Sequence, residues 1–325
     1  MKPLARLCAA LLAAACVSSP AFANSWPNKP VKLIVAQPAG SSPDTTARQI
    51  ALKLSDVWGE QMVVENKAGA NGNIGMQAVA TAPADGYTVG LGVPSNMTIN
   101  PFLYKMPFNP LQDLVPVAQI GSVPFALVVN PKLPVHNVKE LVAYAKSLKG
   151  EMNYSSAGIG NIGHLAAELL ADRGGFSMHH IPNKGDAPAL QDVMAGQTQV
   201  MFVGIPAVAG HARSGRLRLI AVGGTQRLPA FPDVPTIQEA GPAFNDVVIQ
   251  GWNGIVAPAG TPRDVINKMA QDVAKVLDAK EVREQITTST GLVVKVSTPD
   301  EFNTFIRAES TKWGKLISAL NIKVQ

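Results

Sequence analysis

Short runs of consecutive hydrophobic residues alternate along the chain with longer segments in which hydrophobic residues recur every three or four positions. The first pattern predicts buried strands, and the second predicts helices with one buried face. Strands are predicted at 31–36, 61–66, 86–93, 125–130, 152–158, 177–182, 200–205, 217–224 and 249–258. Helices are predicted from about residue 44, near 75–80, and at 137–148, 164–174, 188–196, 261–279 and 298–320.

This alternation of strands and helices indicates an α/β protein with mainly parallel sheets. The chain has 325 residues, enough to bury a large core and to form two domains. No later segment is long and apolar enough to predict a membrane span.

The first 23 residues combine the basic residues Lys2 and Arg6, a short apolar run and the small-x-small motif Ala21-Phe22-Ala23. They predict a secretory signal peptide that is cleaved after Ala23. A lipoprotein processed at Cys16 is the alternative. We therefore expect an exported protein whose mature chain begins near Asn24.

Composition excludes several classes of site. Both cysteines, Cys8 and Cys16, lie in the predicted signal, so the mature chain has no thiol, disulfide or cysteine metal site. Without the two basic residues of the signal, 28 basic residues become 26 against 23 acidic ones, a net charge of +3. No basic run accompanies this mild charge, so nucleic acid is not an expected partner.

Two short sequences occur twice. Pro-Ala-Gly followed by an acid occurs at 38–44 and again at 258–264. Gly-Asn-Ile-Gly occurs at 72–75 and 160–163, each time at the predicted start of a helix. Residues favoured at any helix start explain part of the first repeat. The second repeat is longer, and we expect its copies to lie in different halves of the molecule.

The segment Pro38–Asp44 predicts an anion-binding turn between a strand and a helix. A helix start has N–H groups without partners and a partial positive charge, and small residues let an anion approach them. Ala39, Gly40 and Ser41 are expected to offer N–H groups, and Ser41 or Ser42 a hydroxyl group. A phosphate-binding G-x-x-x-x-G-K-[ST] motif is absent, so a carboxylate is favoured over a triphosphate. We expect Asp44 to cap the helix.

The segment Gly158–Gly163 matches the G-x-G-x-x-G pattern of dinucleotide sites. No acid ends the next predicted strand, and an exported protein rarely meets a nicotinamide cofactor, so a second carboxylate turn is the better interpretation. Asn161 would add side-chain donors. His164 would either donate to the ligand or cap and pack the helix. The motifs G-x-S-x-G, H-E-x-x-H and C-x-x-C are absent, so we expect neither an enzyme, a cofactor nor a metal site.

Segments covering nearly the whole mature chain resemble the Bug (TctC-like) family of periplasmic solute-binding proteins, which serve tripartite tricarboxylate transporters. They include "WPNKPVKLIVAQPAGSSPDTTAR", "VVENKAGANGNIGMQAVATAPADGYTV" and "GRLRLIAVGGTQRLPAFPDVPTIQEAG". The resemblance implies a two-domain Venus-flytrap fold with residues 24–125 and 246–325 in one domain and 126–245 in the other. It further implies a monomer in the periplasm that binds a carboxylate or dicarboxylate between its domains and delivers it to a membrane permease.

The ligand-binding residues expected from these turns and from the resemblance are Gln37, Ala39, Gly40, Ser41, Ser42, Asp44, Ala70, Asn71, Ser95, Gly160, Asn161, His164, Asn183 and Gly204. A secreted enzyme acting on a carboxylate and a ligand sensor for a membrane kinase are the alternative functions. The family commonly has Gly-Gly-x-x-Asp at 40–44, serine at 161, tyrosine at 183 and an aspartate at 203–204. These departures predict a roomier or more amide-rich pocket, suited to a bulkier or aromatic acid.

Overall fold

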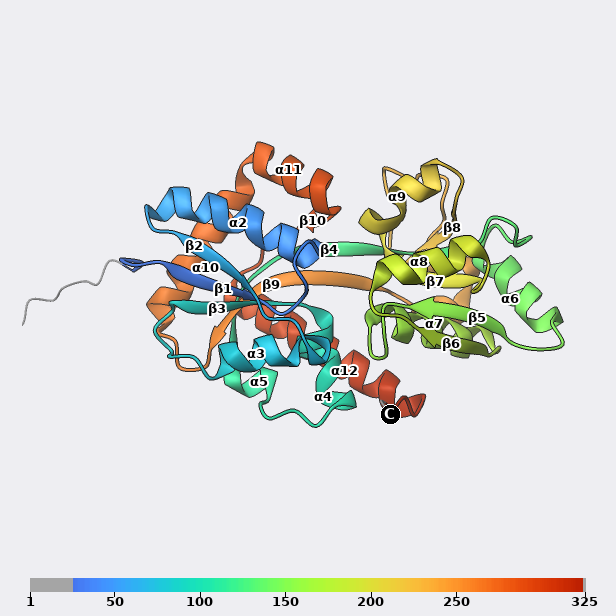
Figure 1. Cartoon of the computed structure of the whole chain (residues 1–325), viewed down its shortest axis with the longest axis horizontal. Coiled ribbons are helices and arrows are strands. Elements are labelled where there is room, and N and C mark those ends of the chain that lie inside the picture. Colours follow the sequence, from blue (N-terminus) through green and yellow to red (C-terminus); the bar gives the residue numbers. More distant parts are fainter. Residues whose placement is uncertain (1–25, 324–325) are drawn as a thin grey trace, which may run out of the picture.

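The computed structural model describes residues 26–323, so the predicted signal peptide with Cys8 and Cys16 lies outside the described residues. The described chain forms two α/β lobes that lie side by side and are joined by two long strands (Figure 1). No helix in this part of the chain is long and apolar enough to cross a membrane.

The first lobe is built on a mixed sheet with the strand order β2-β1-β3-β9-β4. β1 is parallel to β2 and β3, whereas β9 is antiparallel to β3 and to β4. A two-residue strand, β10, pairs antiparallel with β4. The strands are β1 (Val31–Val35), β2 (Met62–Asn66), β3 (Thr88–Gly92), β4 (Leu114–Val129), β9 (Gln250–Pro258) and β10 (Val293–Val294).

The second lobe repeats this plan. β5 (Met152–Ser156) lies parallel to both β6 (Met178–Pro182) and β7 (Val200–Gly204). The far half of β4 pairs antiparallel with β7 and with β8 (Arg218–Val222). The predicted parallel arrangement thus describes β1–β3 and β5–β7, whereas every strand pair that includes β4 or β9 is antiparallel.

β4 is continuous through both lobes. Its residues from Leu114 to Pro124 pair with β9, and those from Phe125 to Val129 pair with β7 and β8. The register with β9 shifts between Pro116 and Ala118, as expected where proline interrupts a ladder. The sequence analysis identified only the last part of this strand.

The helices begin where the apolar periodicity begins and mostly end at glycine or at a break in the pattern. The described helices and helical turns are α2 (Ser42–Trp58), η1 (Ala70–Gly72), α3 (Asn73–Ala80), the π-helical turn η2 (Ser95–Ile99), α4 (Asn100–Leu103), α5 (Pro110–Asp113), α6 (Val138–Ser147), α7 (Ile162–Gly174), α8 (Asp186–Ala195), α9 (Ile205–Arg213), η3 (Gln238–Ala240), η4 (Pro242–Phe244), α10 (Arg263–Asp278), α11 (Lys280–Thr290) and α12 (Pro299–Ala319).

Each lobe has its own buried core, and one cluster crosses between them. Side chains on both faces of the β1–β3 sheet form the core of the first lobe. In the second lobe, one buried cluster also contains Ile99, Trp313 and Ile317 from η2 and α12. Val247 and Ile249 belong to the same cluster, so the chain leaves the second lobe just before β9. Trp252 and Trp313 are both buried in these cores.

Candidate ligand-binding site

The connections that follow the parallel strands lie along one edge of each sheet. In the first lobe β1 leads to α2, β2 leads to η1 and α3, and β3 leads to η2. In the second lobe β5, β6 and β7 lead to α7, α8 and α9. Because parallel strands place their carboxyl ends together, each lobe gathers three helix starts, which is where open α/β sheets bind ligands.

The two edges meet at two places. A Cβ built on Gly160 would lie 2.8 Å from Leu103 Cδ1 and 3.6 Å from Asn71 Nδ2. A Cβ on Gly291, which ends α11, would overlap the ring of Pro206 at the start of α9. The two Gly-Asn-Ile-Gly repeats therefore lie in different lobes, as predicted, and their turns are neighbours.

The buried carboxylate of Asp44 fixes the shape of the turn at 38–41. The side chain is 2% exposed, accepts a hydrogen bond from Gly40 N (2.8 Å) and bonds Asn66 Nδ2 (2.8 Å) and Arg48 Nε (3.1 Å). Burial alone would raise the pKa of Asp44, but these hydrogen bonds with Arg48, Gly40 and Asn66 hold it below its ordinary value. The carboxylate therefore shapes the turn instead of facing a ligand.

This arrangement changes which donors the turn offers. Gly40 N–H donates to Asp44, and Ser41 N–H donates to Pro38 O (3.2 Å). Neither N–H group is therefore free to bind a ligand, contrary to the expectation from the sequence. Ser41 Oγ accepts from Asp44 N (3.4 Å) and keeps its own proton. Ser42 begins α2, where N–H groups have no intrahelical partner. Ala39 is exposed at the tip of the turn.

The second turn of the first lobe has a strained backbone. Gly69, Ala70, Asn71 and Gly72 have φ values of 132°, 46°, 53° and 92° in succession. Such conformations are unfavourable for Ala and Asn and persist where surrounding structure holds them. Here Asn71 Nδ2 donates to Asn100 Oδ1 (2.8 Å), and Asn100 Nδ2 donates back to Asn71 O (3.0 Å). The strain lies where the two lobes meet.

Several buried polar atoms have no partner among the described residues, and two of them, Gln37 Oε1 and Asn96 Nδ2, lie next to the turns of the first lobe. Asn96 is 0% exposed and accepts from Val93 N through Oδ1 (3.0 Å). Its free amide would lie 3.2 Å from a Cβ built on Gly72. The preceding Ser95 starts η2 and is partly exposed. Buried polar groups normally have partners, so a ligand or a water molecule is expected to meet these atoms.

Side chains of Asn161 and His164 stabilise the glycine turn of the second lobe, at 158–163. Asn161 caps α7, because its Oδ1 accepts from Gly163 N (2.7 Å), which leaves its Nδ2 as a donor. His164 is 6% exposed, and its Nδ1 accepts from Gly160 N (3.1 Å). Of the two roles considered for His164, the structure favours support of the turn over donation to a ligand.

Three stacked rings lie behind this turn. The His164 and His180 ring centroids are 4.1 Å apart, and those of His180 and Tyr154 are 4.7 Å apart. Burial lowers the pKa of His164 to about 4. Burial, together with the neighbouring His164 and His179, lowers the pKa of His180 to about 3. The stack is therefore neutral at neutral pH.

These two histidines predict an acid-labile fold. Their folded pKa values lie below the ordinary value of about 6.5, so their stabilising effect is complete above that pH and declines as pH falls towards 4. Between pH 7.5 and 5.5 each ring should reduce the free energy of unfolding by about 1.4 kcal/mol. Urea denaturation at both pH values measures the change.

A matched control for the histidine prediction is His179→Asn, which removes the exposed neighbouring ring outside the stack. This variant should keep the pH dependence. Unchanged stability of the wild type from pH 7.5 to 5.5 would contradict the burial of two neutral rings.

Two further predicted residues, Asn183 and Gly204, lie at the carboxyl ends of β6 and β7; Asn183 directly follows β6. Asn183 donates through Nδ2 to Asp192 Oδ2 (2.9 Å), and its N–H donates to Ser156 O (2.9 Å). Both bonds tie it to its own lobe. Gly204 ends β7 and immediately precedes α9.

Sequence reasoning missed Asn96, Asn100 and Asp186, which the structure places beside the predicted turns. Only Asp186 had a sequence signal, as the acid that opens a helix after Lys184-Gly185.

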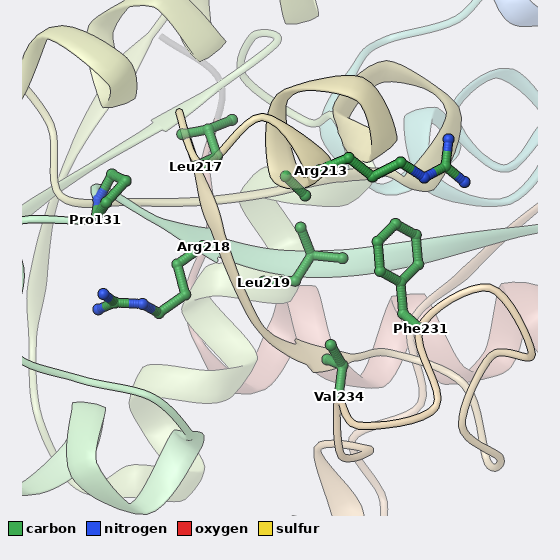
Figure 2. Close-up of a pocket in the computed structure, with 9 residues that line it drawn as sticks. Pro131, Arg213, Leu217, Arg218, Leu219, Phe231 and Val234 are labelled. Atoms are coloured by element: carbon green, nitrogen blue, oxygen red, sulfur yellow. The ribbon is translucent and has the colours of Figure 1, made fainter.

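A surface pocket of about 350 Å³ lies elsewhere in the second lobe. Figure 2 shows Arg213 and Arg218 on opposite sides of a floor that includes Leu219 and Val234. Arg218 is tied to the backbone oxygens of Leu133 and Val135. None of the predicted ligand-binding residues lines this pocket. Within residues 26–323, no cluster of His, Cys, Asp and Glu side chains could hold a metal ion.

The sequence and fold are similar to those of known proteins. A profile of the family described as "Tripartite tricarboxylate transporter family receptor" matches residues 46–322. BugT of Bordetella pertussis is 35% identical over 319 residues, which are 97% of this chain and 96% of BugT.

Two solved structures resemble the whole fold. "R. palustris Rpa4515 with adipate" has a TM-score of 0.83 at 32% identity and covers 92% of this chain and 100% of its own. "MatC (Rpa3494) from Rhodopseudomonas palustris with bound malate" has a TM-score of 0.77 at 27% identity and covers 90% and 100%. The two lobes thus have the periplasmic-binding-protein fold. The chain belongs to the receptor family of the tripartite tricarboxylate transporters, to which the Bug proteins belong.

Proposed function

We propose that this protein is a periplasmic receptor that captures an organic carboxylate between its lobes and delivers it to a tripartite tricarboxylate-type membrane permease. The observation that carries this proposal is the opposition of two sets of helix starts, three from each lobe, which touch through Asn71 and Gly160. Helix starts bind anions through free N–H groups and the helix dipole.

The chemistry of the turns supports a carboxylate. The groups offered are neutral: the N–H of Ala39 and Ser42, the hydroxyls of Ser41 and Ser95, and the Nδ2 of Asn161. Neutral donors satisfy a carboxylate without the lysine and metal ligand that a polyphosphate usually requires. Two relatives at 32% and 27% identity were solved with adipate and with malate, which are both dicarboxylates.

The domain arrangement supports capture by closure. We propose a first domain of residues 24–125 and 246–325 and a second of residues 126–245, with 246–249 packed on the second. β4 changes pairing partners at Pro124 and Phe125, and β9 returns beside it, starting at Gln250. Bending at these two strands would open and close the opposed helix starts. Export by a signal peptide cleaved after Ala23 would bring a monomer to the periplasm.

A hydrolytic function is disfavoured by the environment of the one serine–histidine side-chain pair that lies near these turns within residues 26–323. Ser156 Oγ lies 2.7 Å from His180 Nε2, the spacing of a nucleophile and its base. Ser156 is 0% exposed, however, and the lowered pKa of His180 makes it a weak base. A buried serine with such a partner cannot reach a substrate, so the pair belongs to the scaffold of the turn.

A thermal-shift screen of the mature chain tests the proposed function. The protein is unfolded, refolded to remove bound solute, and heated with mono-, di- and tricarboxylates, aromatic acids and amides. A ligand at 100 times its Kd should stabilise the fold by about 2.7 kcal/mol, a rise in Tm of several degrees. A shift confined to acids is expected. Stabilisation by uncharged compounds only, or by no compound, would contradict the carboxylate proposal.

A further inference from the structure

The lobes are in contact where α11 of the first lobe ends and α9 of the second lobe begins. Both helices lie on the same side of the two long strands that join the lobes (Figure 1). A Cβ built on Gly291 would overlap Cγ of the Pro206 ring and lie 3.0 Å from its Cδ. Gly291 therefore lies directly against Pro206, and the two chain segments can approach this closely because Gly291 has no side chain.

The backbone around Gly291 is fixed within the first lobe. Gly291 N–H donates to Thr287 O (2.8 Å), and Thr287 Oγ1 donates to Leu292 O (3.0 Å). Leu292 is 0% exposed and belongs to the buried core of that lobe. The next two residues form β10, which pairs with β4. Moving this turn to make room for a side chain would therefore break these hydrogen bonds and disturb the core.

The opposing ring is fixed within the second lobe. Pro206 follows Ile205, which is buried in the core of that lobe. A proline ring is closed onto its own backbone, so it cannot rotate aside as a flexible side chain can. The contact at Gly160 differs, because the atom nearest to a Cβ there is the flexible end of Leu103. Of these two contacts, the one at Gly291 limits how closely the lobes approach.

The end of α11 is also tied to α2 of the same lobe. Ser42 Oγ donates to Thr290 O (3.5 Å), and Gln49 Nε2 donates to Ser289 Oγ (2.5 Å). Ser42 is the first residue of α2 and offers one of the neutral donors of the proposed site. The position of Gly291, the next residue after Thr290, is therefore coupled to a helix start that faces the solute.

Pro206 is coupled to the site in the same way, because it is the second residue of α9 and lies two positions after Gly204. The separation of Gly291 from Pro206 thus sets the separation of the starts of α2 and α9. Carbon atoms in contact lie about 3.5–4.0 Å apart, so a side chain at position 291 would open this gap by about 1 Å. Hydrogen bonds of about 2.7–3.2 Å to a solute held between the two starts would not survive that opening.

We propose that Gly291 is a positioning residue for solute binding. Its missing side chain lets the end of α11 lie against Pro206, and this contact sets the distance at which the lobes close on a solute. The inference rests on the proposed function, because it concerns closure around the same opposed helix starts. A larger residue at position 291 would keep the starts of α2 and α9 apart without removing any group that binds the solute.

Isothermal titration of alanine variants tests the inference. It uses adipate, malate and any other acid that stabilises the wild type in the thermal-shift screen. Gly291→Ala should weaken binding about tenfold or more, the effect of losing at least one hydrogen bond to the solute. Pro206→Ala removes the opposing ring and makes room for the added Cβ. The double variant Gly291→Ala/Pro206→Ala should therefore regain the affinity of Pro206→Ala.

Gly59→Ala is the matched control for backbone strain. Gly59 ends α2 as Gly291 ends α11, with φ values of 69° and 63°. A Cβ on Gly59 would meet no atom of residues 26–323 within 4 Å beyond its chain neighbours, so Gly59→Ala should bind like the wild type. Gly291→Asn adds the same Cβ in a residue that tolerates a left-handed backbone. It should fold more stably than Gly291→Ala and bind as weakly.

A second measurement needs no solute. The predicted mature chain has no cysteine, so Leu52→Cys on α2 and Lys139→Cys on α6 place one spin label on an exposed position of each lobe. Pulsed electron paramagnetic resonance should show a longer separation of the labels in Gly291→Ala than in the otherwise unchanged protein. The addition of Pro206→Ala should restore the shorter separation.

Four results would overturn the assignment. They are wild-type affinity in Gly291→Ala, an equal loss of affinity in Gly59→Ala, no recovery when Pro206→Ala is added, and an unchanged separation of the labels in Gly291→Ala. Failure of every acid to bind the wild type would instead overturn the proposed function. The label separation would then still decide whether Gly291 sets the distance between the lobes, so the two failures are distinguishable.

Discussion

Replacing Trp313 with alanine is expected to lower the free energy of unfolding by about 3–5 kcal/mol, the usual loss for a buried tryptophan. Trp313 is 0% exposed, and it belongs to a buried cluster that α12 of the first lobe shares with the second lobe. Its Nε1 donates to Glu309 Oε2 (3.1 Å). The substitution would leave a cavity where the two lobes are packed together. Urea denaturation of the mature chain measures the loss.

Two further variants serve as controls for the Trp313 prediction. Trp313→Phe keeps a ring in the cluster and should lose clearly less stability than Trp313→Ala. Leu52→Ala removes an apolar side chain of α2 that is 60% exposed, so its effect should stay within about 0.5 kcal/mol. A loss below 1 kcal/mol for Trp313→Ala would show that the cluster shared by the lobes contributes little to stability.

The positions of most strands and helices follow from local patterns. The runs that became β1, β2 and β7 were identified because each is rich in apolar residues and is followed by a turn and a periodic segment. The glycine turns were predicted correctly as the starts of α3 and α7. Local residue choice alone sets these features, because a helix start needs small or capping residues wherever it lies.

Strand direction and strand pairing could not be predicted from local sequence patterns. The repeat at 258–264 resembles the turn at 38–44, yet it follows β9, which runs antiparallel to β3. It therefore lies at the opposite edge of the sheet from the candidate site. The length of β4 was missed for a related reason. Pro116 and Pro124 indicate a broken strand locally, but long-range pairing with β9 accommodates both.

The hydrogen bonds made by each predicted residue determine whether its donors are free to bind a ligand. Gly40 and Ser41 have the right residue types, but their N–H groups donate within the turn. His164 has the right position, but its ring accepts a backbone hydrogen bond from inside the lobe. These choices depend on side chains that are close in space and distant in sequence, such as Asn66 beside Asp44.

Replacing Asp44 with alanine is expected to weaken carboxylate binding about a hundredfold, which corresponds to about 2.7 kcal/mol. The Asp44 carboxylate holds Gly40 N–H, Asn66 and Arg48 in one network, and hydrogen bonds to a charged group contribute about 1.5–3 kcal/mol each. Without it the turn at 38–41 loses its fixed shape, so a ligand would have to order the turn on binding. Titration with the best acid from the thermal-shift screen measures the loss.

The control for Asp44 is its counterpart in the second Pro-Ala-Gly repeat. Asp264→Ala removes an exposed acid from the start of α10, away from the opposed turns, and should leave affinity unchanged. Asp44→Asn keeps the size of the side chain but removes its charge and one acceptor, so it should bind with intermediate affinity. Full affinity in Asp44→Ala would show that the turn keeps its shape without the carboxylate, and that the donors on the other helix starts are sufficient to hold the solute.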